Sequence, residues 1–256
     1  MSATRVLALG LFLFTAGPAA WSAGLQVSPV RLQFAPEQQA QALQLNNNAA
    51  APIHVQVRVM RWAQREQQDV LEAQDEILAS PAIVQVLPGQ TQTVRLVRSR
   101  INTAELEQSY RVLVDELPAS AQDSQAAQSG LQLLMRYSIP VFIAARSGAE
   151  GRRATESDTQ PAAATRLKAR LQPATGTGSR LELRNDGQQA VRISQLRAML
   201  SDGRYISLSE GLLGYVLPGQ LMAWSFEQPL SPGVVLEAQL NDEPGQQRLP
   251  LQDAAL

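Results

Sequence analysis

The chain contains no cysteine, and its only histidine is His54. Without cysteine the protein has no disulfide, no thiol nucleophile and no cysteine-based zinc site. One histidine cannot supply a histidine pair for a metal, and neither a recognisable Ser-His-Asp set nor a phosphate-binding glycine loop is present. These absences argue against an enzyme, a metal site and a cofactor.

Aromatic residues and charge are also scarce. Aromatics make up 5% of the 256 residues, charged residues make up 18%, and the formal net charge is −1. Such a balance gives no electrostatic reason to expect nucleic acid as a partner, and scattered aromatics are not typical of a sugar-binding surface. The apolar content of 45% is that of a globular protein large enough for two ordinary domains.

Only one long apolar run occurs, and it lies at the N-terminus. Arg5 is followed by VLALGLFLFTAG and then by the small residues of AAWSA. A basic start, a short apolar stretch and small residues are typical of a signal peptide, and the run is too short for a permanent membrane helix. We predict a signal peptide over residues 1–23, cleaved between Ala20 and Ala23, an exported mature chain and no stable membrane insertion.

Most of the remaining chain alternates between apolar and polar residues, which is the pattern of β-strands. A helical signal is present only at 104–108. The expected strands cover approximately 26–34, 41–46, 53–62, 83–87, 92–98, 109–116, 131–143, 166–171, 180–185, 190–200, 222–227 and 234–240. We therefore predict an all-β fold of two Ig-like β-sandwich domains, residues 24–148 and 165–256, joined by a linker over 149–164.

The two halves share an order of motifs. LQLNNNAAAPIHVQVRV and a later VLPGQTQTVRLV in the first half correspond to LELRNDGQQAVRISQL and VLPGQLMAWSF in the second. In LPGQ, proline presets φ and glycine tolerates positive φ, as a tight turn requires. Two related β domains explain the repeat, and convergence on common turn chemistry is the alternative.

The stretch LQLLMRYSIPVFI, Leu131–Ile143, is longer than a small domain needs. Every odd-numbered residue in it is apolar or aromatic. A single strand of this length runs roughly 43 Å at about 3.3 Å per residue, about twice the usual length. It predicts one strand with a continuous apolar face.

Four segments, in order, resemble the first domain of the periplasmic pilus chaperones of the chaperone–usher pathway. They are LQVSPVRLQF at 25–34, VLPGQTQTVRL, YRVLVDELP at 110–118, and LQLLMRYSIPVFI. The form RYSIPVF is more similar to the archaic or alternative branch. The resemblance implies two Ig-like domains around an interdomain cleft, location in the periplasm, and two partners: a pilus or fimbrial subunit and the outer-membrane usher. It implies no cofactor. An exported Ig-like pilus subunit or adhesion module is the alternative function.

In that family the long strand completes the fold of a subunit that lacks one strand, which is a form of β-augmentation. By resemblance, the donor residues are Leu131, Leu133, Met135 and Tyr137. The later odd residues of the strand, 139 to 143, are expected to pack in the chaperone's own core.

The resemblance also implies a basic anchor for the C-terminal carboxylate of the subunit. Arg31 stands at the family's cleft arginine, and a guanidinium can hold a carboxylate through two hydrogen bonds. The family's second basic residue falls on Pro140. Arg136 is therefore expected to take its place, with Arg95 and Arg111 as weaker candidates.

An ionic network between the domains is implied as well. Glu116 resembles the acidic member of that network, and Arg146 lies near the position of its arginine.

Overall fold

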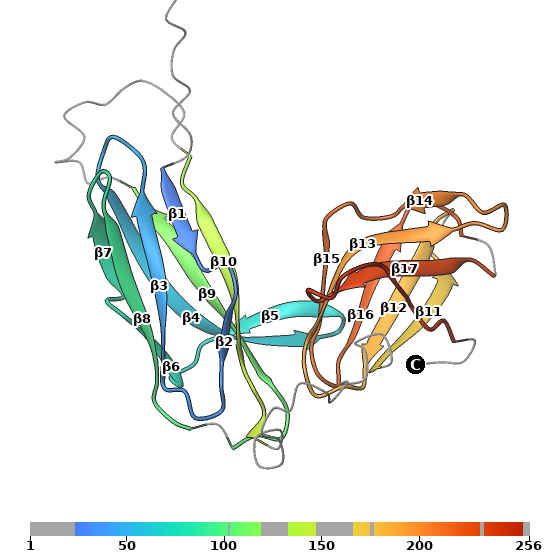
Figure 1. The fold of residues 1–256 in the computed structure, drawn as a ribbon, viewed down its shortest axis with the longest axis horizontal. Helices are drawn as coiled ribbons and strands as arrows, with labels where there is room; N and C mark the ends of the chain where they lie inside the picture. Colours follow the sequence, from blue (N-terminus) through green and yellow to red (C-terminus); the bar gives the residue numbers. More distant parts are fainter. Residues whose placement is uncertain are drawn as a thin grey trace, which may run out of the picture.

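A computed structural model describes residues 24–101, 103–118, 133–146, 166–174, 177–230 and 233–252. The fold is all-β and consists of two Ig-like β-sandwiches, as predicted (Figure 1). The predicted signal peptide, residues 1–23, and the predicted linker, residues 149–164, lie outside the described residues. Within them, no helix is long and apolar enough to cross a membrane, and no group of three metal-binding side chains occurs.

Two sheets form the first sandwich. One has the order β1-β3-β8-β6, and the other has the order β2-β10-β9-β4-β5, with β7 also paired to β4. The strands are β1 Leu25–Ser28, β2 Leu32–Phe34, β3 Ala40–Asn47, β4 Ile53–Arg65, β5 Gln68–Glu72, β6 Ile77–Ser80, β7 Ile83–Val86, β8 Thr91–Arg98, β9 Gln108–Leu117 and β10 Arg136–Ile143.

The segment expected as one strand over 26–34 is two strands in different sheets. β1 pairs antiparallel with β3, whereas β2 pairs parallel with β10. Pro29 lies in the break, and proline cannot donate to a sheet ladder, so pairing ends there. The chain crosses from one sheet to the other directly before Arg31.

The long strand is shorter than expected. β10 begins at Arg136, and Leu133–Met135 precede it outside any strand. Leu131 and Gln132 lie outside the described residues. The side chains of Ile139, Val141 and Ile143 are buried in the core of the first sandwich, as their odd positions predict.

The second sandwich pairs a sheet of order β11-β12-β16 with one of order β14-β13-β17-β18, in which β15 also pairs with β13. Its strands are β11 Leu167–Pro173, β12 Ser179–Asn185, β13 Val191–Met199, β14 Tyr205–Ser207, β15 Leu212–Val216, β16 Leu221–Phe226, β17 Val235–Leu240 and β18 Gln247–Arg248. The five strands expected here are present. β14, β15 and β18, like β5 and β6 in the first domain, were not predicted.

The sequence repeat corresponds to one hydrogen-bonded turn built twice. Asn47 ends β3, Asn185 ends β12, and both are fully buried. Each carbonyl accepts the N–H of the glycine of LPGQ, Gly89 or Gly219, at 2.8 Å. The amides make matching bonds of 2.8 to 2.9 Å to backbone carbonyls, from Asn47 to Ala51 and Val86 and from Asn185 to Gln189 and Val216. Both glycines have positive φ, 69° and 71°, where a side chain would strain the backbone.

Candidate functional site: the interdomain cleft and the open edge of β10

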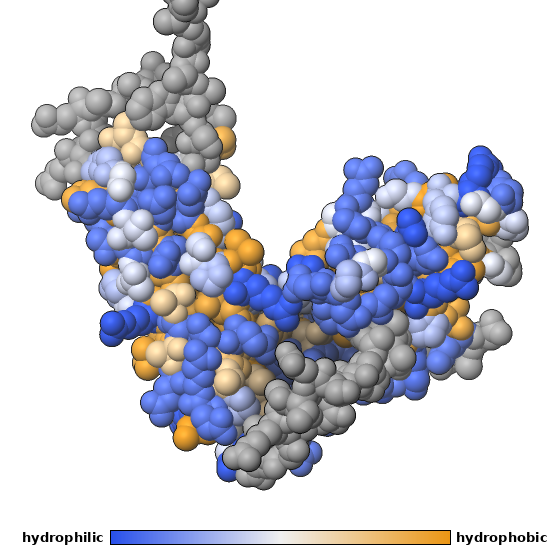
Figure 2. Space-filling view, viewed as in Figure 1, coloured by the Kyte–Doolittle hydropathy of each residue, from blue (hydrophilic) through white to orange (hydrophobic). Residues whose placement is uncertain are grey.

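Three aromatic rings join the two domains. Trp62 on β4 and Phe142 on β10 face Tyr215 on β15, with ring centroids 5.3 Å (Trp62–Tyr215) and 6.0 Å (Phe142–Tyr215) apart. All three rings are buried, together with Ala190 and Leu217 of the second domain. This cluster, the hinge cluster, holds the sandwiches against each other at one end and leaves a hollow between them (Figure 2).

Two polar side chains of the first domain bind the backbone of the second domain beside the hinge cluster. Gln64 donates to the carbonyl of Tyr215 and accepts from the N–H of Leu217, both at 2.9 Å. Glu107 accepts from the N–H of Ala190 at 2.9 Å and from Gln33 Nε2 at 3.2 Å. Burial raises the pKa of Glu107, and these hydrogen bonds only partly oppose the rise.

Trp62, Gln64 and Glu107 were not predicted from the sequence. A change of buried face along β4 marks the interface residues. Val55, Val57 and Val59 are buried at odd positions, whereas Trp62 and Gln64 are buried at even positions. The buried face changes where β4 leaves the core of its own domain and meets the second domain.

Arg31 lies in the hollow between the domains, as the family resemblance implied. The hollow has a volume of about 720 Å³ and is lined by residues of both domains, among them Glu107 and Asp242. The Arg31 guanidinium lies 5.2 Å from the centroid of the Phe142 ring and donates from Nη1 to Asp242 Oδ2 at 3.3 Å.

Arg111 lies on the other side of Pro140 from Arg31. In the sheet, Pro140 is opposite Arg111 on β9, and Leu32, which follows Arg31, is opposite Val141. The Arg111 guanidinium stacks 3.7 Å from the centroid of Trp62 and 5.5 Å from that of Tyr215, and its burial lowers its pKa. Arg31 and Arg111 thus both contact the hinge cluster, so they lie on the same face of the sheet.

One edge of β10 is open above this pair of arginines. β2 covers that edge only from Val141 to Ile143, and no other described strand pairs with it between Arg136 and Pro140. Upstream of this edge, Leu133 is 72% exposed and Met135 is 40% exposed. A free strand edge preceded by exposed apolar side chains is a template for pairing with another chain.

Tyr137 differs from the other predicted donor residues because it packs against the core of its own domain. Its hydroxyl donates to the carbonyl of Leu25 on β1. Leu131, the remaining predicted donor, lies outside the described residues.

The structure does not bring Arg136 to Arg31. Arg136 begins β10, four residues from Pro140, which is about 13 Å along an extended strand. Its guanidinium pairs with Asp115, which also accepts from Arg58 at 2.7 Å. Burial alone would raise the pKa of Asp115, but the hydrogen bonds from both arginines outweigh it and lower this pKa. That Arg136 binds the subunit carboxylate stays a prediction.

Glu116 is not an interdomain residue, so that prediction is wrong. Its carboxylate accepts from the N–H of Met135 at 3.2 Å, and its own N–H donates to the Met135 carbonyl at 3.0 Å. This places Glu116 at the far end of β9 from Glu107, which makes the interdomain contact. Arg146 lies beyond the opposite end of β10, where its N–H donates to the Ala104 carbonyl, so it and Glu116 cannot share one network.

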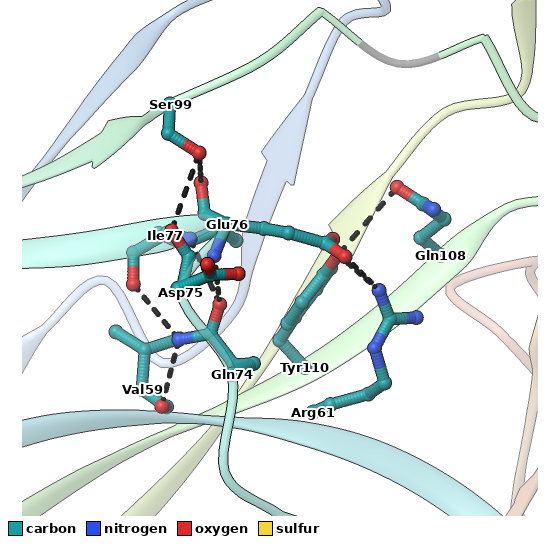
Figure 3. Close-up of polar contacts among 9 residues, drawn as sticks. All are labelled: Val59, Arg61, Gln74, Asp75, Glu76, Ile77, Ser99, Gln108 and Tyr110. Atoms are coloured by element: carbon teal, nitrogen blue, oxygen red, sulfur yellow. Dashed lines mark hydrogen bonds and ion pairs between the residues drawn. The ribbon is translucent and has the colours of Figure 1, made fainter.

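A separate polar network closes the first domain near the start of β6 (Figure 3). The Glu76 carboxylate accepts from Arg61 on β4 and from the hydroxyl of Tyr110 on β9, and Gln74 ties this turn to Val59 and Ile77. Burial alone would raise the pKa of Glu76, but the bonds from Tyr110 and Arg61 lower it. These contacts join strands of the two sheets, which gives the network a structural role.

The comparisons with known proteins agree with this geometry. Residues 24–147 match the family described as pili and flagellar-assembly chaperone, PapD N-terminal domain. No match was found among curated protein sequences.

Among solved structures, the chain is similar to one in the CsuC–CsuE chaperone–tip adhesion subunit complex from archaic chaperone–usher Csu pili of Acinetobacter baumannii. Identity is 27%, the TM-score is 0.69, and the alignment covers 90% of this chain and 100% of that one. Two further chaperones share the fold. YadV is 18% identical with a TM-score of 0.61 and 89% and 100% coverage, and DraB of E. coli is 19% identical with a TM-score of 0.54 and 89% and 98% coverage. Residues 24–147 therefore belong to the pilus assembly chaperone family, and nearly the whole chain shares the fold of chaperones of the chaperone–usher pathway.

Proposed function

We propose that this protein captures pilus subunits in the periplasm by donor-strand complementation and delivers them to the outer-membrane usher. The observation that carries the proposal is the open edge of β10, with exposed apolar side chains at its upstream end and Arg31 at its downstream end. A subunit that lacks one strand would pair with this edge, and Leu133 and Met135 would fill its groove.

The direction of the added strand follows from β2. β2 runs parallel to β10 and takes up pairing at Val141. A subunit strand that also runs parallel to β10 would lie in line with β2 and end just before it. Its C-terminal carboxylate would then meet Arg31, with Arg111 across Pro140. A charged anchor at this point sets the register, which decides whether the apolar side chains face the groove.

Burial of the exposed apolar side chains can contribute substantially to the free energy of subunit binding. Burying two large apolar side chains stabilises a complex by about 3–6 kcal/mol before costs, and the added main-chain hydrogen bonds contribute further. Loss of rotational freedom and ordering of the segment offset part of this gain. Because these costs reduce the gain from strand pairing, we expect stable binding to need both the paired strand and the contact with Arg31.

Location follows from the family and from the sequence. Chaperone–usher chaperones act in the periplasm, and the predicted signal peptide over residues 1–23 supports the same location for this chain. The family consists of chaperones, and we propose no catalytic activity. The alternative of a pilus subunit or adhesion module is disfavoured, because residues 24–147 match a family of assembly chaperones.

The anchor is tested by Arg31→Gln. The affinity-tagged protein is purified from a periplasmic extract of cells that assemble the pilus, and subunits that copurify are quantified. Capture should fall sharply while the melting temperature stays unchanged, because Arg31 makes only one long hydrogen bond, to Asp242, among the described residues. Arg95, a weaker candidate for the second anchor, is exposed on β8 in the sheet that does not contain β10, so Arg95→Gln is the matched control and should capture normally. Full capture by the Arg31 variant would exclude the anchor.

A further inference from the structure

The cleft arginine already has an anionic partner within the chain. Asp242 follows β17 in the second domain, and its side chain is 71% exposed at the rim of the hollow. Its two carboxylate oxygens bind different domains: Oδ2 accepts from Arg31 Nη1 at 3.3 Å, and Oδ1 accepts from Arg192 Nη2 at 2.8 Å.

Hydrogen bonds to Arg192 fix the position of Asp242 and its neighbour Asn241 on the second domain. Asn241, with a φ of 53°, exchanges backbone contacts with Arg192: its N–H donates to the Arg192 carbonyl at 2.8 Å, and its side-chain oxygen accepts the Arg192 N–H at 3.0 Å. Arg192 Nη2 also donates to the Asn241 carbonyl at 2.6 Å. The contact with Arg31 is the longer and weaker of the two carboxylate contacts.

A single hydrogen bond joins Arg31 to Asp242. Its guanidinium rests on the Phe142 ring and carries five N–H donors, of which Asp242 takes one in the described structure. A second carboxylate can therefore reach the same guanidinium, and Asp242 keeps its bonds to Arg192 when it gives up Arg31.

We propose that Asp242 is a built-in stand-in for the subunit carboxylate, which occupies Arg31 in the free chaperone and is displaced on capture. The inference rests on the proposed role of Arg31 as the anchor. Because an incoming carboxylate competes with Asp242 for the guanidinium, Arg31 alone binds carboxylates more weakly, and a ligand succeeds only when it also pairs with β10. Asp242 is in this way a specificity-determining residue that selects strand ends over free anions.

The alternative is that the Arg31–Asp242 pair only fixes the angle between the domains. The two roles predict opposite effects for Asp242→Asn. If Asp242 is a stand-in, its neutralisation strengthens the binding of a carboxylate at Arg31. If it is a structural link, its neutralisation leaves that binding unchanged or weakens it, because the anchor is less well positioned.

The test compares two synthetic ten-residue peptides of alternating apolar and polar residues, one with a free C-terminal carboxylate and one amidated, by titration calorimetry with the full mature chain. Asp242→Asn should bind the carboxylate peptide roughly two- to fivefold more tightly than wild type, the range that corresponds to an exposed ion pair. The amidated peptide should bind both proteins equally. Asp202→Asn, which removes the same charge from an exposed pair with Arg204, should bind both peptides as wild type does.

The controls separate this inference from the proposed function. Arg31→Gln should abolish the preference for the carboxylate peptide, and a preference that survives would overturn the anchor itself. If Arg31→Gln abolishes the preference but Asp242→Asn fails to strengthen carboxylate binding, only the stand-in role is wrong. Acetate, followed through the NMR signal of the Arg31 Nε–H, provides the same comparison with a ligand that makes no strand contacts, and an equal response in wild type and Asp242→Asn would also overturn the stand-in role.

Discussion

At the scale of single residues, Glu107 couples the domain interface to pH. Its carboxyl group is buried against Ala190 of the second domain, and burial raises its pKa above the ordinary value near 4.5. The folded chain therefore binds this proton more tightly than the unfolded chain does. The stability that the group contributes is present below the ordinary pKa and is lost as the pH rises through the folded pKa.

We expect Glu107→Gln to remove the loss of stability that wild type shows as Glu107 ionises at higher pH. The free energy of unfolding, measured with urea between about pH 4 and about pH 8, should change in favour of the variant as the pH rises. The difference between variant and wild type isolates Glu107 from Asp115 and Glu76, whose lowered pKa values act in the opposite direction. Glu105→Gln, the same change at an exposed neighbour, is the matched control. A flat difference for Glu107→Gln itself would contradict the assignment.

Single residues were predicted unevenly from the sequence. The position of Arg31 in the cleft was predicted because it lies in a local motif, SPVRLQF, that resembles the family's first strand. Arg111 was ranked below Arg136 because its position beside Pro140 depends on the pairing of β9 with β10, which no local pattern specifies. Glu116 was misassigned for the same reason, since its bonds to Met135 follow from that register.

At the scale of elements, the donor segment depends on alternation. Leu133 and Leu134 are both exposed, at 72% and 48%, and differ mainly in which face of an extended chain they occupy. Leu133 shares the face of the buried Ile139 and Val141, which is the face that would enter a subunit groove.

Leu133→Asp should therefore abolish subunit capture, because burying an unpaired charge in the groove costs several kcal/mol. Leu134→Asp places the same charge on the other face and should reduce capture far less. Both variants should melt at the temperature of the wild type, since neither side chain is part of a core. Copurification of subunits and thermal melts measure the two effects. Unfolding of the free Leu133→Asp protein would show that this residue belongs to the core.

Alternation identified the longer strands well, because burial on one face imposes a period of two. It did not separate β1 from β2, since the two strands bury their apolar residues against one core although they lie in different sheets. The three- to five-residue strands β5, β6, β14 and β15 escaped because so few residues cannot establish a period.

At the scale of the whole molecule, two sandwiches were predictable because the sequence repeats one turn, built around Asn47 and Asn185. The contact between them was not. The hinge cluster contains Trp62 and Phe142 of the first domain and Tyr215 of the second. The alternation of each of their strands predicts burial within its own domain and not contact with the other domain. The junction matters for function, since it sets the distance between the anchor and the second domain.

In the proposed complex, a subunit strand pairs with the open edge of β10 and ends at Arg31. Because the Met135 carbonyl faces β9, the amides of Arg136 and Ser138 face the open edge. Hydrogen exchange at these amides, compared between the free chaperone and the complex with a copurified subunit, tests the claim directly. Their exchange should slow in the complex, while that of Gln68–Glu72 on β5, the opposite edge of the same sheet, should be unchanged. Unchanged exchange at β10 with a subunit bound, or new protection at β5 instead, would contradict it.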